Sequence, residues 1–521
     1  MKCANCGGKM TADMKFCGAC GTPVEHTEPA AVDTVPDSPK DKADGTRLKK
    51  YIAPAAIVIA VVILAGIAWS IFKPSNYGKY VNTFRISQTG EQIIIQYPGK
   101  DKSVTNGALG RVEYSLDGTK AAYLINDDAD FSEKAGYNLY LIDKDQSMQI
   151  ATDVYDMVIS SSGEGVAFVQ EVFGGVGKLS LYRKGETTAI SDDFPVYGSL
   201  TISPDGRIVG YNALDDDGDM IGYYYDGKQK ELGKDVSPVA IANGAKYVYY
   251  NKNSKLYVQR GDNIETRVSL GEYRYLIGFN KDLSQAIYIT ETDSGTRSYI
   301  TRNGGEKERL SGELWNILLP HGTMWKHPIL GIDSFANTYY QSFDDAVYRI
   351  TDKFECTRII REAEAPQLSS DGKTITYQRD DRIEKINGSK EDAEAVKLVE
   401  DEVRTYIAVE DGSAIYFVNH YDELYYQKGT NKPVLIGDGV QTHDGQSLVL
   451  YKGNKLFYVS DKELYVSTGS KGTRVAGIDG DVESVGMERF DVTVFTYDHN
   501  EACIYRSIDG INFDLVYQEQ D

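Results

Sequence analysis

The chain has 521 residues, with 56 Lys and Arg against 77 Asp and Glu, 41% apolar residues, 50 Gly, 38 Tyr and six Cys. This length is ample for a large core. The net charge of −21, combined with a mixed apolar and charged composition, excludes a basic nucleic-acid-binding protein, a collagen, a disulfide-stapled miniprotein and a wholly disordered acidic chain. The charge is uneven, since residues 1–74 hold nine basic and seven acidic groups and residues 75–521 hold 47 and 70.

Four cysteines near the amino terminus form the sharpest local motif. They are two Cys-x-x-Cys pairs, each followed by glycine: Cys3, Cys6, Cys17 and Cys20. Glycine lets the chain turn tightly under an ion, and two thiolates from each pair complete a closed tetrahedral Zn²⁺ site. A segment this short cannot build a sufficient core alone, so the metal would supply most of its folding free energy. The spacing predicts one structural zinc ion; an iron site, a redox dithiol pair and two disulfides are the alternatives.

Residues 1–24 resemble the short zinc ribbons at the amino terminus of many bacterial membrane proteins. The resemblance rests on the two glycine-followed cysteine pairs and extends no further along the chain. His26 lies just beyond the second pair and is interpreted as a linker residue, because four thiolates already complete the site. Residues 25–50 combine Pro, Gly, Ala, Thr and Ser with charges and lack an apolar period, which is typical of a flexible linker, here with a basic juxtamembrane end.

An uncharged stretch of 21 residues follows, from Ile52 to Phe72. At ~1.5 Å per residue, a helix of this length crosses the core of a bilayer, so we expect a transmembrane helix over residues 51–72. Three basic residues directly precede the span, and the positive-inside rule then places the amino terminus in the cytoplasm. The predicted location is therefore the cell membrane, with a single span and an extracytoplasmic domain over residues 75–521.

Cysteine usage agrees with this orientation, because the four zinc-binding thiols would stay reduced on the cytosolic side. The outer region contains only Cys356 and Cys503. A disulfide between them is an alternative, but two isolated buried cysteines are the favoured interpretation.

After Pro74 the chain becomes a succession of short strand-like runs punctuated by Asp-Gly, Asn-Gly and Lys-Gly turns, which is an all-β pattern. When the turns are aligned, a turn glycine is followed five positions later by an aromatic or aliphatic residue. The pairs are Gly118 with Tyr123, Gly163 with Phe168, Gly206 with Tyr211, Gly244 with Tyr249, Gly372 with Tyr377, Gly412 with Phe417, and Gly445 with Leu450; Leu283 with Tyr288 fits without the glycine. Two hairpins per period make a four-stranded sheet, and the recurring aromatic residue is interpreted as core between successive sheets.

Three of these turns carry a more specific pattern: Ser115-Leu-Asp-Gly, Ser203-Pro-Asp-Gly and Ser369-Ser-Asp-Gly. They resemble the WD40-like repeats of TolB and of the amino-terminal propeller of dipeptidyl peptidase IV relatives. The resemblance covers about residues 80–517 and implies a β-propeller with a binding surface on one face of the disc. The repeat residues are structural, so no functional residue is carried over from it.

The number of blades is less well defined than the fold. Eight repeat units have a clear anchor, by which we mean the aromatic or aliphatic residue five positions after the turn glycine or its equivalent. Two further units, near Gly90 and Phe490, are degenerate. We expect a mainly β chain with one propeller of seven or eight blades; two smaller propellers, divided by the irregular stretch Leu310–Phe343, are the alternative. That stretch is interpreted as a degenerate blade with a long loop, with a functional lid as the alternative. It contains two tryptophans and two histidines, at Trp315, His321, Trp325 and His327.

No catalytic motif is found: the sequence lacks G-x-S-x-G, H-E-x-x-H and a phosphate-binding loop. We therefore predict that the protein is not an enzyme; carboxylates in the propeller pore are the alternative route to a hydrolase or lyase. Asp215–Asp219 and Asn126–Asp130 are rich in oxygens that suit Ca²⁺ but lack the full twelve-residue ligand pattern, so calcium is the weaker alternative to solvated loops. Ser507–Phe513 has a faint likeness to the Asp-box turn of sialidase-type propellers and predicts a turn only.

These features together predict a single-pass membrane-anchored binding or sensing protein with a cytosolic structural zinc ribbon. Its exported propeller would bind a protein, a peptide or a cell-wall component. An envelope hydrolase or lyase and a passive envelope scaffold are the alternatives. No nucleic-acid partner is expected, because so acidic a surface repels phosphate backbones.

Overall fold

The computed structural model describes residues 85–89, 92–96, 103–126, 136–143, 146–261, 268–272, 275–292, 295–321, 323, 325–390, 393–400, 402–442, 448–488, 491–498, 501–507 and 509–518. The predicted zinc ribbon, linker and transmembrane segment lie outside these residues. Residues 74–521 form one compact unit. Within the ranges given, no helix is both long enough and apolar enough to cross a membrane.

Short antiparallel sheets follow one another along the chain. Sheet 1 has three strands: β1 (Arg85–Thr89), β2 (Gln92–Gln96) and β3 (Ser103–Asn106). Sheets 2 and 3 share a strand and comprise β4 (Ala108–Tyr114), β5 (Lys120–Asn126), β6 (Tyr137–Asp143), β7 (Gln146–Ile159), β8 (Gly165–Phe173), β9 (Val176–Arg183) and β10 (Glu186–Pro195). Sheet 4 comprises β11 (Leu200–Ile202), β12 (Val209–Leu214), β13 (Met220–Tyr225) and β14 (Gln229–Lys234). Sheet 5 comprises β15 (Val236–Ile241), β16 (Tyr247–Lys252), β17 (Lys255–Arg260) and β18 (Val268–Glu272), with the 3₁₀ turn η2 (Asn243–Ala245) between its first two strands.

The remaining sheets repeat this plan, with one insertion. Sheet 6 comprises β19 (Tyr275–Phe279), β20 (Ala286–Thr292), β21 (Gly295–Arg302) and β22 (Glu306–Arg309), extended by β24 (Trp325–Lys326) and β25 (Ile329–Leu330). Sheet 7 comprises β23 (Leu314–Leu318), β26 (Tyr339–Ser342), β27 (Val347–Ile350) and β28 (Cys356–Ile360). Sheet 8 comprises β29 (Glu364–Leu368), β30 (Thr374–Arg379), β31 (Arg382–Asn387) and β32 (Val396–Val399); sheet 9 comprises β33 (Val403–Ala408), β34 (Ala414–Asn419), β35 (Leu424–Lys428) and β36 (Val434–Gly437). Sheet 10 comprises β37 (Leu448–Tyr451), β38 (Lys455–Ser460), β39 (Glu463–Ser467) and β40 (Thr473–Arg474); sheet 11 comprises β41 (Asp481–Glu488), β42 (Asp491–Asp498), β43 (Glu501–Ser507) and β44 (Asp514–Gln518).

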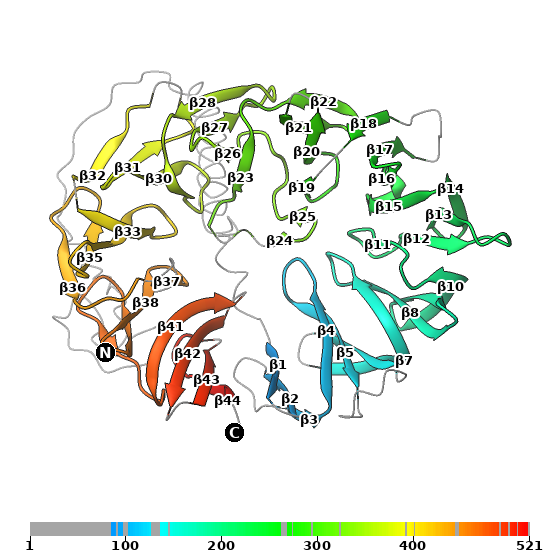
Figure 1. Cartoon of the computed structure of the whole chain (residues 1–521), viewed down its shortest axis with the longest axis horizontal. Helices are drawn as coiled ribbons and strands as arrows, with labels where there is room; N and C mark the ends of the chain where they lie inside the picture. The colour runs from blue at the N-terminus through cyan, green and yellow to red at the C-terminus, as the bar shows by residue number, and fades with distance from the viewer. Residues whose placement is uncertain are drawn as a thin grey trace, which may run out of the picture. The chain divides into compact units, whose positions relative to one another are not determined.

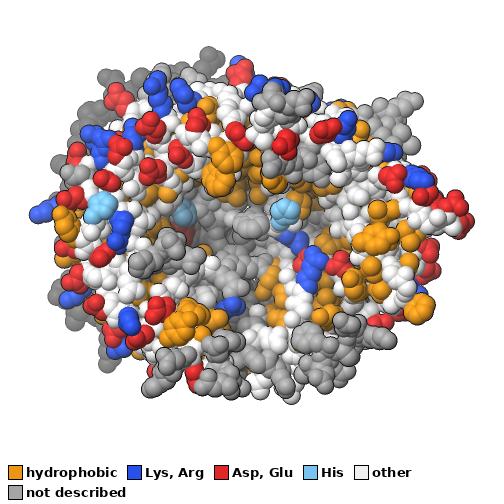
Figure 2. Space-filling model, in the orientation of Figure 1, with side chains coloured by type: hydrophobic (Ala, Val, Ile, Leu, Met, Phe, Trp, Pro, Cys, Tyr) orange, Lys and Arg blue, Asp and Glu red, His pale blue; other side chains and the backbone are white. Residues whose placement is uncertain are grey.

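The sheets of this unit succeed one another around a ring, with blue β1–β3 beside red β41–β44 (Figure 1). The space-filling view in the same orientation is hollowed near the middle of the ring (Figure 2). Strands β1 and β44 are in contact, but they belong to different sheets. Packing between the first and last sheets therefore completes the ring, and no single sheet closes on itself among the described strands.

The burial of each strand follows its place in its sheet. The second strands are apolar on both faces, as in β5 with its run Ala121–Asn126 and in β34, where all six residues are buried. A continuous apolar run of this length between turn residues is typical of a strand with a sheet packed on each side. Fourth strands such as β32 are exposed or half-buried along their length, because they form the outer edge.

Each pair of consecutive sheets shares one hydrophobic core, from sheets 1 and 2 through to sheets 10 and 11. Seven of the anchors predicted from the repeat lie in these cores on second strands, as expected, and are buried: Tyr123, Phe168, Tyr211, Tyr249, Tyr288, Tyr377 and Phe417. Leu450 is also buried, but it lies on β37, the first strand of sheet 10, and its predicted turn glycine, Gly445, lies outside the described residues. Several of the aromatic anchors stack on an aromatic residue of the third strand, such as Tyr123 on Tyr140 with ring centroids 5.3 Å apart and Tyr288 on Tyr299 at 5.8 Å. Such pairs contribute about 0.5–1.5 kcal/mol each beyond the area they bury.

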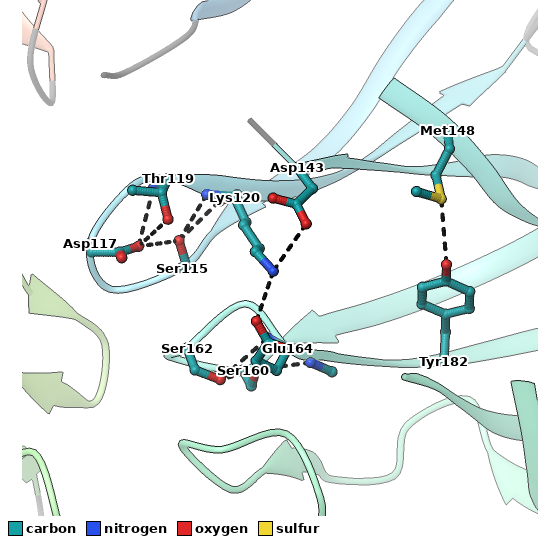
Figure 3. Close-up of polar contacts among 11 residues, drawn as sticks. Ser115, Asp117, Thr119, Lys120, Asp143, Met148, Ser160, Ser162, Glu164 and Tyr182 are labelled. Atoms are coloured by element: carbon teal, nitrogen blue, oxygen red, sulfur yellow. Dashed lines mark hydrogen bonds and ion pairs between the residues drawn. The ribbon is translucent and has the colours of Figure 1, made fainter. Parts of the chain in front are cut away.

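The Asp-Gly turns between the first and second strands have one repeated hydrogen-bond pattern, drawn for sheet 2 in Figure 3. The Ser115 hydroxyl donates to Asp117 Oδ1 at 2.7 Å and accepts the Lys120 N–H at 3.0 Å, five residues on. The same two bonds recur at Ser203 and Ser369. Burial raises the pKa of Asp117, but the hydrogen bonds from Ser115 and Thr119 outweigh it, so the pKa lies below its ordinary value. The turn therefore holds its aspartate charged.

The number of sheets corrects one prediction. The expectation of seven or eight blades is too low, since the described residues form ten hydrogen-bonded sheets, and the seven-stranded sheet β4–β10 contains two four-stranded units that share β7, numbered sheets 2 and 3 above. The eight clear anchors belong to sheets 2–6 and 8–10, while sheets 1, 7 and 11 lack a recognisable turn glycine and anchor pair. The alternative division into two propellers at Leu310–Phe343 is not observed, because one core joins sheets 6 and 7 at that point.

The turns of neighbouring sheets pack backbone to backbone, and this contact yields a prediction. Gly206 has φ 72°, and a Cβ added there would lie 2.5 Å from the Gly165 nitrogen of sheet 3. Gly218 has φ 78°, but a Cβ there would meet nothing within 4 Å. Gly218→Ala should therefore cost only the left-handed penalty of about 1–2 kcal/mol. Gly206→Ala adds a backbone clash and should cost about 3–5 kcal/mol in all.

Chemical denaturation of the two variants and the native chain measures the difference. Equal losses of stability in the two variants would contradict close packing between the turns of sheets 3 and 4.

Candidate functional site

The two ends of the strands form two different faces. Turns between the second and third strands, and junctions from a fourth strand to the next sheet, lie together at one end, which we call the junction face. Backbone hydrogen bonds join these segments: Val196 to Gly175, Asp235 to Met220, Ala363 to Asp345, Val403 to Asp381, and Val440 to Asp422. The other end, which we call the turn face, holds the turns between the first and second strands and between the third and fourth.

The turn face is interlocked from sheet to sheet. The Leu116 N–H donates to the Ser161 carbonyl at 2.8 Å, and the Ser162 N–H donates to the Pro204 carbonyl at 2.9 Å, so three successive turns are connected. Lys120 reaches across the same boundary to Glu164 at 2.8 Å (Figure 3). Substitution in one such turn disturbs its neighbour, which leaves this face little freedom to vary.

Exposed aromatic side chains are confined to the junction face. Every Tyr, Phe and Trp that is exposed within the described ranges lies in a turn between second and third strands, at a junction, or on a strand beside one: Tyr155, Phe173, Tyr197, Tyr275, Trp315, Phe343, Tyr421 and Tyr497. Exposed aliphatic residues are distributed differently, for example Val434 and Leu435 on the outer strand β36 and Ile511 on the turn face. In Figure 2 hydrophobic side chains gather over β11–β13 and beside β23.

Trp315 and Phe343 form the one pair of exposed aromatic rings in contact among the described residues. Trp315 is the second residue of β23, Phe343 directly follows β26, and their ring centroids are 4.8 Å apart at an angle of 63°. Their exposed fractions are 61% and 56%. The Phe343 N–H donates to the Glu313 carbonyl at 2.9 Å, and the Thr296 hydroxyl donates to the Glu313 carboxylate. The backbone under the pair is therefore fixed, while both rings stay accessible to a ligand.

The irregular stretch Leu310–Phe343 is a degenerate sheet with a long loop, as we expected. Its loop between β23 and β26 contains the hairpin β24–β25, and β25 pairs in parallel with β19 on the inner edge of sheet 6. The loop also reaches sheet 8, because the His321 N–H donates to the Leu368 carbonyl at 3.1 Å. Burial lowers the pKa of His321. His327 is exposed in the hairpin turn, so the two histidines of this stretch lie in different environments.

A four-residue ion cluster joins this hairpin to sheet 2 near the middle of the ring. Lys326 Nζ lies 2.8 Å from Glu113 Oε2, although the two residues are 213 positions apart. Glu113 also accepts the Ile159 N–H at 3.2 Å and pairs with Arg111, which in turn lies 2.5 Å from Asp156 Oδ1. Leu116 packs on the core that contains Ile329 of the hairpin. The hairpin therefore bridges sheets 6 and 2 across the interior, as Figure 1 also shows for β24 and the end of β4.

Both carboxylates of this cluster are engaged in ion pairs. Glu113 and Asp156 lie on inner strands, and each is paired with a cation of the cluster. Balanced charges at these distances stabilise a fixed contact between distant parts of the chain. The contact of Lys326 with Glu113 could not be predicted from the sequence, since no periodic pattern relates a loop residue to a strand five sheets away.

Glu410 is the buried carboxyl group whose environment is most unusual. It follows β33 in the turn of sheet 9; its Oε1 accepts the Gly453 N–H at 3.1 Å, and its Oε2 has no hydrogen-bond partner within the described part of the chain. Burial raises the pKa of Glu410 to about 7, against the hydrogen bond from Gly453 and with a contribution from Asp411. Glu410 therefore changes charge near neutral pH.

The other predicted sites have the following outcomes. The zinc ligands Cys3, Cys6, Cys17 and Cys20 lie outside the described residues. Cys356 and Cys503 are both free thiols, but only Cys503 is buried and Cys356 is half-buried, so the expectation of two isolated buried cysteines holds for Cys503 alone. Among the residues that the structure describes, no three His, Cys, Asp or Glu side chains converge on a metal position. In the acidic loop of sheet 4, Asp215 Oδ1 accepts the N–H groups of Asp217 and Asp219, which is the arrangement of an ordinary turn.

Comparison with known proteins finds similar solved structures only. No protein-family model matches the chain, and no curated protein matches it. TolB from Acinetobacter baumannii aligns with a TM-score of 0.28 and 15% identity over 46% of this chain and 65% of its own. A eukaryotic initiation factor aligns at 0.38 and 10% over 68% and 94%, and the β-propeller domain of the Trilobed protease from Pyrococcus furiosus at 0.30 and 10% over 64% and 98%.

The structural neighbours thus include TolB proteins and propeller domains of peptidases, and the tricorn protease and a prolyl endopeptidase are among the peptidases. The chain spans just under two thirds of the Acinetobacter TolB and 58% of the tricorn protease. None of these TM-scores supports an argument about ligand or activity.

The bridge between the hairpin and sheet 2 can be tested by substitution. Lys326 and Glu113 are 19% and 13% exposed, so Lys326→Met removes one of the two cationic partners of a largely buried carboxylate. We expect a loss of about 1–3 kcal/mol in the free energy of unfolding. Lys281→Met is the matched control, because Lys281 pairs with Asp333 at 3.0 Å on the surface and should contribute less than about 1 kcal/mol. Equal effects of the two substitutions, measured by denaturation, would show that the bridge adds nothing.

The raised pKa of Glu410 predicts a pH dependence of stability. The ordinary glutamate value of 4.5 applies to the unfolded chain and about 7 to the folded chain, so the folded state binds the extra proton between these values. The contribution of Glu410 to stability is therefore fully present below about pH 4.5, falls as the pH rises to about 7, and is constant above that. Glu410→Gln should reduce the loss of stability between pH 5 and pH 8 by roughly 1–3 kcal/mol.

Thermal unfolding at the two pH values measures this change. The native chain, measured under the same conditions, is the reference. If Glu410→Gln and the native chain lose the same stability, Glu410 is not the titrating group.

Proposed function

We propose that the chain is a membrane-anchored binding or sensing protein, and that the junction face of its large domain is the binding surface. The observation that carries this proposal is the confinement of all exposed aromatic side chains of the described residues to that face. Single exposed apolar residues are ordinary, but a set of aromatic residues gathered on one face is typical of a contact surface, and Tyr and Trp dominate the energetics of many binding surfaces.

The pair Trp315 and Phe343 is the proposed centre of the surface. Its rings are more than half exposed, and the hydrogen bonds around Glu313 hold its backbone in place. A preorganised aromatic pair stacks on an apolar peptide side chain or on a sugar ring with little loss of conformational freedom on binding. A protein, a peptide or a cell-wall component is therefore the proposed class of ligand. The acidic character of residues 75–521 favours neutral or cationic partners and disfavours nucleic acid.

The location of this surface is also a proposal, and it rests on the sequence. The uncharged span over residues 51–72 and the basic residues before it support an extracytoplasmic position for the large domain. The four cysteines support a structural Zn²⁺ in the cytosolic ribbon. A protein with a ligand-binding domain on one side of the membrane and a small metal-stabilised domain on the other has the parts of a sensor.

The proposal is tested with the full-length chain in detergent, used to capture partners from solubilised envelope proteins and cell-wall fragments. The double variant Trp315→Ala, Phe343→Ala should weaken binding of the captured partner about 10-fold or more, because loss of a central aromatic contact typically costs over 1 kcal/mol. Val434→Ala, Leu435→Ala is the matched control: it removes two exposed apolar side chains from the outer strand β36 and should leave affinity within about twofold.

Undiminished binding by the double aromatic variant would contradict the assignment of the junction face. Cleavage of a glycan or peptide during the incubation would favour a hydrolase over a binding protein. Capture that is unaffected by removal of the zinc ribbon, together with an unchanged cellular response to the ligand, would favour a passive scaffold over a sensor.

A further inference from the structure

A cavity of about 390 Å³ lies at the seam between sheets 10 and 11, on the turn face. It is lined by the segment from β39 to the residues after β40, by Lys455 at the start of β38, and by Gly510 and Ile511 of sheet 11. It therefore lies at the opposite ends of the strands from the aromatic junction face, and nothing in the proposed function makes use of it.

The cavity has a structural cause in the length of one strand. The outer strand β40 has two residues, whereas the outer strands β36 and β44 of the adjacent sheets have four and five. The segment Thr468–Gly472 before β40 is held away from the usual edge position. Gly472 donates its N–H to the Ile436 carbonyl at 3.2 Å, and a Cβ at Gly472 would lie 1.9 Å from the Tyr458 hydroxyl oxygen. The shortened edge leaves the space unfilled.

The charge of the lining is the reverse of the charge of the domain. Three cationic side chains and no carboxylate line the cavity: Lys455, Lys471 and Arg474. Residues 75–521 carry 70 acidic and 47 basic groups, so a purely cationic lining stands out from its surroundings. Ser467, Thr468, Ser470 and Thr473 add hydroxyl groups to the same wall.

The nearby carboxylates leave this positive charge largely uncompensated. Glu463 lies 3.0 Å from Arg474 and neutralises one of the three cations. Asp509 directs Oδ1 to the N–H groups of Ile511 and Asn512 and Oδ2 to the Asn512 side chain, so it is engaged within its own turn. Lys455 donates a hydrogen bond to the Gly510 carbonyl at 3.4 Å and lies over the ring of Tyr451. Neither partner carries a negative charge. Lys471 has no ion-pair partner among the described residues.

We propose that this cavity binds the phosphoryl group of a small phosphorylated sugar or polyol. Lysines and an arginine at a concave wall are suited to a phosphate dianion, and the serine and threonine hydroxyls are suited to the hydroxyl groups of the attached polyol. The volume is at the lower end of the range for small-molecule sites, which fits a ligand of this size. The net negative charge of residues 75–521 disfavours a long polyanion, so a free small phosphate ester fits better than a polymer of phosphodiesters.

Calorimetric titration of the full-length chain in detergent tests this site, with glucose 1-phosphate as the probe and glucose as the neutral control. We expect saturable binding of glucose 1-phosphate, competition by inorganic phosphate, and no heat of binding with glucose. Lys471→Gln should weaken binding at least about fivefold, while Lys471→Arg, which keeps the charge, should retain it within about twofold. Absence of saturable binding, or equal binding of glucose, would overturn the proposal.

A matched control comes from the opposite face of the same sheet. Lys462 pairs with Asp481 at 2.7 Å on the junction face, and Lys462→Gln should leave glucose 1-phosphate binding unchanged. If Lys462→Gln weakens binding as much as Lys471→Gln, the probe responds to net charge and the cavity is not a specific site. The variant Trp315→Ala, Phe343→Ala should bind glucose 1-phosphate normally, so failure of this proposal and failure of the junction-face proposal give different results.

Discussion

Burial shared between consecutive sheets is the interaction on which the whole structure depends. A four-stranded sheet of this chain cannot bury both faces of its second strand, which has five consecutive apolar residues in β5 and in β34. Only a neighbour on each side removes that surface from water, at roughly 25 cal/mol per Å². The buried aromatic anchors on second strands lie in such shared cores, and several of them, such as Tyr123 and Tyr288, stack on a ring of the third strand. No sheet is therefore expected to be stable without its neighbours.

This dependence makes the two faces of the molecule different. On the turn face, the turns of successive sheets touch through backbone atoms, as Gly165 and Gly206 do, and a side chain has no room between them. On the junction face, the connections leave one sheet and enter the next, and their side chains face solvent rather than a neighbouring turn. Aromatic residues on the junction face do not disturb the packing of the cores, because other residues form the cores. The constraint that fixes one face thus leaves the other free to acquire a binding surface.

The sequence was informative wherever the repeat itself determines the structure. The turn glycines and the aromatic residue five positions later follow from local geometry: a tight turn needs a positive φ, and the strand after it places a fixed residue in the core. Sheet 7 and the number of sheets could not be obtained in this way, because its first and second strands are separated by a loop that pairs with sheet 6. The contact of Lys326 with Glu113 depends on the closure of the ring, which no local pattern describes. The exposed aromatics of the junction face were missed for a related reason, since in the sequence they are indistinguishable from the buried tyrosines that stand a few residues away.

The candidate sites coincide with the places where the repeat is broken. A regular sheet has its strands, turns and core residues dictated by two neighbours, so a substitution that serves a ligand would disturb one of them. The insertion between β23 and β26 relaxes this requirement in sheet 7, where Trp315 and Phe343 form an exposed pair. The shortened β40 relaxes it in sheet 10, where the outer edge gives way to a cationic cavity. In a chain built from repeats, irregular segments are where residues are free of the packing that the other sheets require, and their side chains are then available for recognition.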